Sequence, residues 1–76
     1  MEEQFNFGAA LLLLKNGQRV SRVGWNGKGM FLGLQNPDEH SANRKPYIYI
    51  VPVDGERVPW VASQSDMLAE DWIEVT

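Results

Sequence analysis

The sequence predicts a small α+β domain: an antiparallel sheet of about four to five strands with two short helices packed on it. The first observation behind this fold class is an apolar stripe with helical spacing near the N-terminus. The second is a series of short β-rich segments separated by glycine-containing turns. The third is a helix-capping pattern just before the last segment. At 76 residues there is room for one hydrophobic core, so we expect a single domain over residues 1–76.

The first predicted element is a helix over residues 7 to about 16. Asn6 is a suitable N-cap, and Gly17 suits the position after the helix end. The stripe expected to face the core consists of Phe7, Ala10, Leu11 and Leu14. Leu12 and Leu13 lie off this stripe, so we expect the helix to contact more than one surface. Either the chain's own sheet wraps around it, or another subunit covers part of it.

Five short segments are predicted to be strands because they alternate or are rich in β-branched and aromatic residues. They cover residues 19–23, 30–34, 47–51, 57–62 and 72–75. The glycine-rich turn 24–29 joins the first two into a hairpin, and the polar stretch 36–46 is a loop. Asp54-Gly55 marks the next turn. Pro59 indicates that the fourth strand lies at an edge or contains a bulge.

A short second helix is predicted before the last strand. Ser63 or Ser65 can cap it, and it is expected to run through Met67 to about Glu70. The first serine and Asp66 have the spacing of a capping box. Asp66 and Glu70 would then share one helix face, which we interpret as surface charge.

Charge and composition limit the partners that can be expected. A net charge of −3 argues against general binding of DNA or RNA, which needs a basic stripe. Arg19, Arg22 and Lys28 are nevertheless close in sequence and predict a local basic cluster for a small anion. The chain has no cysteine and one histidine, His40, so we expect no disulfide, no metal site and no cofactor.

The remaining exclusions concern membranes and catalysis. The longest apolar run, residues 9–14, is six residues and too short to span a bilayer. The chain begins Met-Glu-Glu, without the positive region of a signal peptide, so we expect a soluble intracellular protein with no membrane partner. Neither a nucleophile–base pair nor a phosphate-binding loop is present in the sequence, so we do not expect an enzyme.

Two tryptophans in polar surroundings are the main functional signal. Trp25 lies in the glycine-rich turn, and Trp60 precedes a run of serine, glutamine and aspartate. Such rings suit a flat, hydrogen-bonding ligand such as a nucleobase, although each could instead be a core aromatic. Trp72 is expected to be core. Tyr47 and Tyr49 should share one sheet face and line either a pocket or an oligomer interface.

The order of these motifs resembles the phage-encoded Thoeris anti-defence sponge proteins of the second type. The matching segments are 7–8, 24–30, 46–48, 59–60 and 63–72. The resemblance implies a protein that binds a cyclic ADP-ribose isomer made by bacterial TIR-domain enzymes and does not cleave it. It also implies a homotetramer with ligand pockets between protomers, acting in the cytoplasm of the infected bacterial host. Some similar proteins also take up cyclic dinucleotides at a separate site.

Carried onto this chain, the resemblance implies three kinds of ligand-binding residue. Stacking or wall residues would be Trp25 and Trp60, the polar residues Asn26, Ser63, Gln64 and Asp66, and the apolar support Phe7, Met30 and Tyr47. Lys28 would contact a phosphate if one lies near it. Two alternative functions stay open: capture of cyclic dinucleotides, and direct inhibition of a host enzyme through the leucine-rich helix and the tyrosines.

Overall fold

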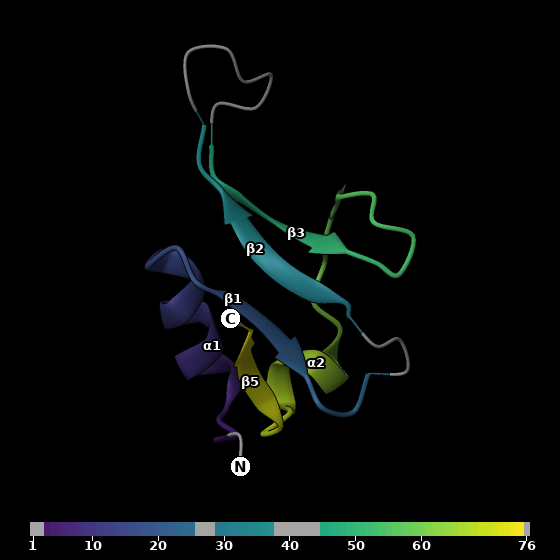
Figure 1. Cartoon of the computed structure of the whole chain (residues 1–76). Helices are drawn as coiled ribbons and strands as arrows, with labels where there is room; N and C mark the ends of the chain where they lie inside the picture. The colour runs from purple at the N-terminus through teal and green to yellow at the C-terminus, as the bar shows by residue number, and fades with distance from the viewer. Residues whose placement is uncertain (1–2, 26–28, 38–44, 76) are drawn as a thin grey trace.

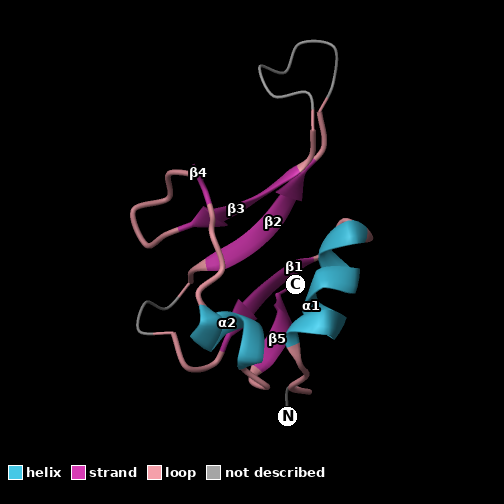
Figure 2. Cartoon of the chain, turned by 180° about the vertical axis from the view of Figure 1, so that it is seen from behind, coloured by secondary structure: helices cyan, strands magenta, loops and turns pink. Residues whose placement is uncertain are grey.

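The computed structural model describes residues 3–25, 29–37 and 45–75. Its elements are α1 (Phe7–Lys15), β1 (Arg19–Arg22), β2 (Phe31–Gln35), β3 (Tyr47–Val51), β4 (Val58–Pro59), α2 (Gln64–Leu68) and β5 (Trp72–Val75). The strands form one antiparallel sheet in the order β4-β3-β2-β1-β5 (Figure 1). Both helices lie near the β1–β5 end of this sheet (Figures 1 and 2). The predicted α+β fold class is confirmed.

The ends of α1 follow the local signals in the sequence. The Asn6 side chain accepts a hydrogen bond of 2.9 Å from the backbone N–H of Ala9, which satisfies one of the free donors of the first turn. Gly17 follows the helix with a φ of +89°, a conformation that a side chain would disfavour. The predicted cap and end of α1 are therefore confirmed.

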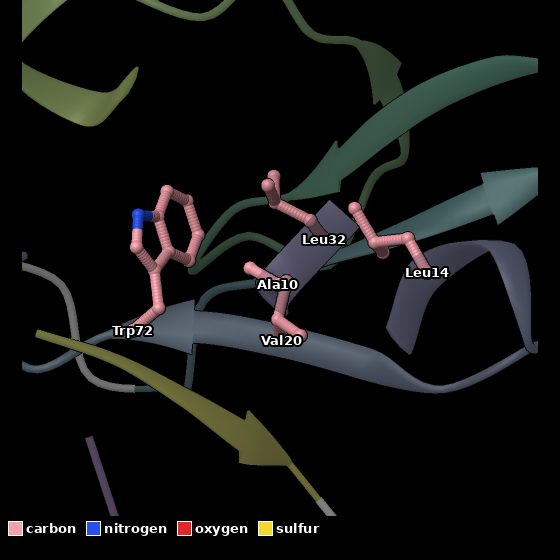
Figure 3. Close-up of a cluster of buried hydrophobic side chains, with 5 residues drawn as sticks. All are labelled: Ala10, Leu14, Val20, Leu32 and Trp72. Atoms are coloured by element: carbon pink, nitrogen blue, oxygen red, sulfur yellow. The ribbon is translucent and has the colours of Figure 1, made fainter. Parts of the chain in front are cut away.

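The core lies between α1 and the sheet. Its fully buried side chains are Ala10, Leu14, Val20, Leu32 and Trp72 (Figure 3). Phe7 and Leu11, the other members of the predicted stripe, pack against this core, and so does Leu13. Only Leu12 of the leucine run is exposed, at 61%. Most of the leucine run therefore packs on the chain's own sheet.

The two faces of the sheet differ. Leu32 pairs with Val20 on one side and with Ile50 on the other, so these three side chains share the face that packs on α1. Tyr49 pairs with Gly33 on the opposite face, which confirms the predicted alternation of tyrosines and isoleucines in β3. Within the described part of the chain, no helix covers this second face, as the two opposite views show (Figures 1 and 2).

The segment around β4 departs from the prediction. Only Val58–Pro59 pairs with β3, whereas residues 57–62 were expected to form a strand. Pro59 has no N–H to donate, and the next backbone N–H, that of Trp60, donates to the carbonyl of Ile48 at 2.9 Å. Pairing thus ends after one further bond, and the predicted edge position of this strand is confirmed.

The second helix is shorter than expected. Ser63 is its N-cap in a complete capping box with Asp66, so of the two candidate caps the first is used. The helix ends at Leu68, because Ala69 is extended, with φ −71° and ψ 150°. Glu70 therefore lies beyond the helix, and the expectation that it shares a helix face with Asp66 is wrong.

Candidate functional site

Three aromatic rings gather around one buried indole. The ring centroid of Trp72 lies 5.3 Å from that of Phe7, 5.5 Å from that of Trp25 and 6.3 Å from that of Trp60. Both other indoles meet Trp72 nearly perpendicularly, at 78° and 84°. Edge-to-face contacts of this kind contribute about 0.5–1.5 kcal/mol each beyond burial. Trp72 is fully buried and its three neighbours are half-buried, so each of these three residues keeps part of its surface exposed.

These rings come from segments far apart in the chain. Phe7 opens α1, Trp25 follows β1, and Trp60 follows β4. Phe7 also lies 6.2 Å from Trp60, so the cluster closes on itself. Trp72 can sit at its centre because β5 pairs with β1 and also makes a bridge to Phe5. We call this group of four rings the aromatic cluster.

The carboxylate of Asp66 borders the aromatic cluster. Its Oδ1 accepts hydrogen bonds from Arg22 Nη1 at 2.8 Å and from Trp25 Nε1 at 3.2 Å. Its Oδ2 accepts from the Oγ and the backbone N–H of Ser63, at 2.9 and 3.3 Å. The backbone carbonyl of the same residue accepts from Trp72 Nε1 at 3.0 Å. One residue of α2 thus binds two of the three indole N–H groups.

A second carboxylate completes the polar border. Asp71 Oδ1 accepts a hydrogen bond of 2.8 Å from Nε of Arg22, whose Nη1 bonds Asp66. Asp71 Oδ2 accepts from the backbone N–H of Gly24 at 2.8 Å. A Cβ at Gly24 would itself fall 2.8 Å from that oxygen, so glycine permits this close approach. We call Arg22, Asp66 and Asp71 the ion-pair network.

The ion-pair network shifts the pKa values of its members. Burial raises the pKa of Asp66, but hydrogen bonds from Arg22, Ser63 and Trp25 together bring it below its ordinary value. The hydrogen bond from Arg22 is the main reason that the pKa of Asp71 is lowered. The same bonds raise the pKa of Arg22. At neutral pH all three groups are charged, so the network carries a net charge of −1.

The predicted basic cluster is not formed by its two described members. Arg22 is held in the ion-pair network, on the same side of β1 as buried Val20. The guanidinium of Arg19 instead lies 5.0 Å from the ring centroid of Phe31. Residues three apart on a strand point to opposite faces, which is the physical reason that this prediction is wrong. Lys28, the third member, lies outside the described residues.

Of the ten predicted ligand-binding residues, the structure gathers five at one place. They are Phe7, Trp25, Trp60, Ser63 and Asp66. Gln64 is exposed at the start of α2, and Met30 is half-buried just before β2. Tyr47 opens β3 on the sheet face away from the aromatic cluster, so within one chain it does not join the others. Asn26 and Lys28 lie outside the described residues.

Sequence reasoning missed the ion-pair network and the central position of Trp72. One signal could have pointed to Arg22: alternation in β1 places it on the same side as Val20, whose apolar side chain is suited to the core. An arginine on a core face needs a carboxylate partner. Asp66 and Asp71 lie 44 and 49 residues away, so the pattern could not name them.

The described residues contain neither a metal-binding cluster nor a membrane-spanning helix. Residues 3–25, 29–37 and 45–75 hold no group of three or more histidine, cysteine, aspartate or glutamate side chains that could bind a metal ion. Across those same stretches, no helix has the length and apolarity needed to cross a membrane.

Comparison with known proteins adds the family. The model of the Tad2-like family, described as a Thoeris anti-defense 2-like domain, matches residues 5–75. The chain is also 40% identical over 85 residues to Thoeris anti-defense 2 of Bacillus phage SP01. That alignment covers 95% of this chain and 96% of the relative. The resemblance noted from the sequence motifs is confirmed, and the chain belongs to the Thoeris anti-defense 2-like family.

Proposed function

We propose that this protein binds a cyclic ADP-ribose isomer made by bacterial TIR-domain enzymes and holds it without cleaving it. The captured signal then cannot activate the Thoeris effector. Membership of the Thoeris anti-defense 2-like family supports a role against Thoeris defence. The identity of the captured signal is our proposal, and so is the place where it acts, the cytoplasm of an infected bacterium.

The observation that carries this proposal is the seating of Trp25 and Trp60 on Trp72. Both outer rings are half-buried, and each contacts the buried indole at its edge, so their orientation is fixed before a ligand arrives. Stacking of a base on an aromatic side chain contributes about 1–3 kcal/mol. Two oriented rings can therefore bind a purine with little ordering cost on binding.

The polar groups beside the rings support binding rather than chemistry. A carboxylate that acts as a general acid or base works best with a pKa near the working pH, and the pKa values of Asp66 and Asp71 are instead lowered. Both are also hydrogen-bonded to Arg22. We propose that the protein is not an enzyme and needs no cofactor.

The proposed contacts follow the predicted residues apart from Asp66, whose carboxylate already accepts four hydrogen bonds. Trp25 and Trp60 would stack on the ligand or form its walls, with Phe7 behind them. Ser63 and Gln64 lie at the start of α2, where hydroxyl and amide groups can bind ribose oxygens. We propose that the remaining predicted residues also contact the ligand. They are Asn26, Lys28, Met30 and Tyr47.

We further propose that the protein is a homotetramer. The sheet face opposite α1 carries half-buried apolar side chains, among them Phe31, Tyr49 and Ile73. A second copy of the chain can cover such a face, and a chain of 76 residues buries little surface by itself. This arrangement would bring Tyr47 of one chain into contact with another chain.

The two alternative functions differ in their support. Capture of cyclic dinucleotides uses the same stacking chemistry, and a competition experiment separates it from capture of cyclic ADP-ribose. Inhibition of a host enzyme was suggested by the leucine-rich helix and the tyrosines, but Leu11, Leu13 and Leu14 pack on or in the chain's own core. That packing removes the support that came from the helix and leaves the support that came from the tyrosines.

Calorimetry followed by recovery of the ligand tests the proposal. The isomer, purified from a TIR enzyme reaction, is titrated into the protein, the complex is heated, and the supernatant is analysed by mass spectrometry. We expect a heat of binding and recovery of the intact isomer. A titration without heat would contradict capture, and a shortened or linearised product would contradict binding without cleavage. A cyclic dinucleotide added as competitor identifies the preferred ligand.

A further inference from the structure

Trp25 is held from three directions in the structure. Its backbone N–H donates to the carbonyl of Arg22 at 3.2 Å, and its indole N–H donates to Asp66 Oδ1 at the same distance. Its ring stands nearly perpendicular to that of Trp72. Of these three contacts, only the hydrogen bond donated by the indole N–H is made to a charged side chain, that of Asp66.

Asp66 is in turn fixed by its neighbours. A carboxylate has about four lone-pair positions. Arg22, Trp25 and the two donors of Ser63 occupy them, at distances of 2.8 to 3.3 Å. The side chain of Asp66 is 14% exposed, and that of Arg22 is 19% exposed. A direct bond from this carboxylate to a ligand would require one of the existing bonds to break.

The charges also argue against a direct contact between Asp66 and the ligand. A cyclic ADP-ribose isomer carries a diphosphate, and the ion-pair network has two carboxylates for one guanidinium. Asp66 is therefore poorly suited to lie against the phosphates. Its bonds suit a different task, which is to orient the ring that the ligand meets.

We infer that Asp66 is a positioning residue, which acts on the ligand through Trp25, and that Arg22 holds it in place. The inference rests on the proposed function, in which Trp25 contacts the ligand. A side chain fixed before binding loses less conformational freedom when the complex forms. Release of the indole from Asp66 should therefore weaken binding about two- to tenfold.

A double-mutant cycle distinguishes this indirect role from direct contact. Trp25→Phe keeps an aromatic ring but removes the indole donor, and Asp66→Asn removes the charge of its partner. The affinity for the cyclic ADP-ribose isomer is measured for the wild type, both single variants and the double variant. If Asp66 acts through Trp25, Asp66→Asn weakens binding in the wild type but has little further effect beside Trp25→Phe. Equal losses in both backgrounds would overturn the inference.

Glu70→Gln is the matched control for the loss of one carboxylate charge. Glu70 is exposed next to Asp71 and has no bond to Arg22 or to an indole among the described contacts. We expect this variant to bind the isomer within about twofold of the wild type, because the indole bond remains. A loss as large as that of Asp66→Asn would overturn the specific role of Asp66.

The NMR signal of the Trp25 indole N–H in the free protein distinguishes positioning of this ring from a general structural role of Asp66. In protein labelled with ¹⁵N at tryptophan, the Trp25 indole N–H signal should shift and exchange faster with water in Asp66→Asn. It should stay near its wild-type position in Glu70→Gln. An unmoved signal in Asp66→Asn would overturn the inference whatever the affinity.

Two further results keep the test decisive. If Asp66→Asn does not fold, Arg22→Lys replaces it in the cycle, because lysine keeps the charge but cannot bond both carboxylates as a planar fork. If the wild type does not bind the isomer, the proposed function fails and the inference fails with it. Binding by the wild type with equal losses in both backgrounds overturns the inference alone.

Discussion

The indole of Trp25 stands at 78° to that of Trp72, with ring centroids 5.5 Å apart. The ring of Trp25 is half-buried and that of Trp72 is fully buried, so the buried ring supports the outer one. The indole of Trp60 lies at 84° to that of Trp72. This division into a buried support and two outer rings leads to different expectations for the three tryptophans.

Substitution of Trp25 by alanine should weaken ligand binding while the fold persists. The lost stacking corresponds to about a five- to 150-fold weaker affinity, measured by calorimetry with the cyclic ADP-ribose isomer. Val53→Ala is a suitable control, because Val53 is 71% exposed in the turn between β3 and β4. Unchanged affinity in Trp25→Ala would mean that this ring belongs to the core or to an interface.

Substitution of Trp72 by phenylalanine should act mainly on stability. The change removes a fully buried indole and its 3.0 Å hydrogen bond to the Asp66 carbonyl. We expect the free energy of unfolding to fall by about 1–3 kcal/mol, measured by urea titration. The same change at the half-buried Trp60 should lower the free energy of unfolding by a smaller amount. An equal loss for both would contradict the assignment of Trp72 as the support.

The ion-pair network should make stability sensitive to acid. The pKa values of Asp66 and Asp71 lie below their ordinary value of 3.8, so the unfolded chain binds protons that the folded chain does not. Their contribution is fully present above that value and is lost as the pH falls through the folded pKa values. The free energy of unfolding, followed from pH 5 to pH 2, should fall less steeply in Asp66→Asn than in the wild type. Parallel curves would show that Asp66 does not contribute.

A methyl group at Gly33 should disturb the uncovered sheet face. Its Cβ would overlap the ring of Tyr49, which pairs with it across β2 and β3. That ring also carries the guanidinium of Arg57 at 4.2 Å from its centroid, so it cannot shift alone. We expect Gly33→Ala to cost about 1–3 kcal/mol in thermal or urea unfolding. In a Tyr49→Ala background, Gly33→Ala should no longer lower the free energy of unfolding. A loss of stability that persists in that background would point to backbone strain instead.

Local signals in the sequence predicted much of the fold. β3 and β5 were predicted to the residue, and Asn6 and Ser63 cap their helices as expected. Each of these features depends on neighbours within a few residues. The shortening of β4 does not, because it depends on how Pro59 meets β3.

The candidate site could be predicted only in part, because it is assembled from distant segments. Trp25 and Trp60 were identified from their polar surroundings, but their contact with Trp72 is tertiary. The pairing of Arg22 with two carboxylates is also tertiary, and it replaced the expected basic cluster. Strand alternation could have excluded Arg19 from that cluster, whereas no pattern in the sequence identified Asp66 as the partner of Trp25.

A crystal structure of the protein with the cyclic ADP-ribose isomer tests the central proposal most directly. We expect the purine base to lie against the indole of Trp25 or Trp60, with Asp66 still bonded to Trp25. Ligand bound at another surface, with both indoles free of contact, would contradict the proposal that the aromatic cluster captures the signal.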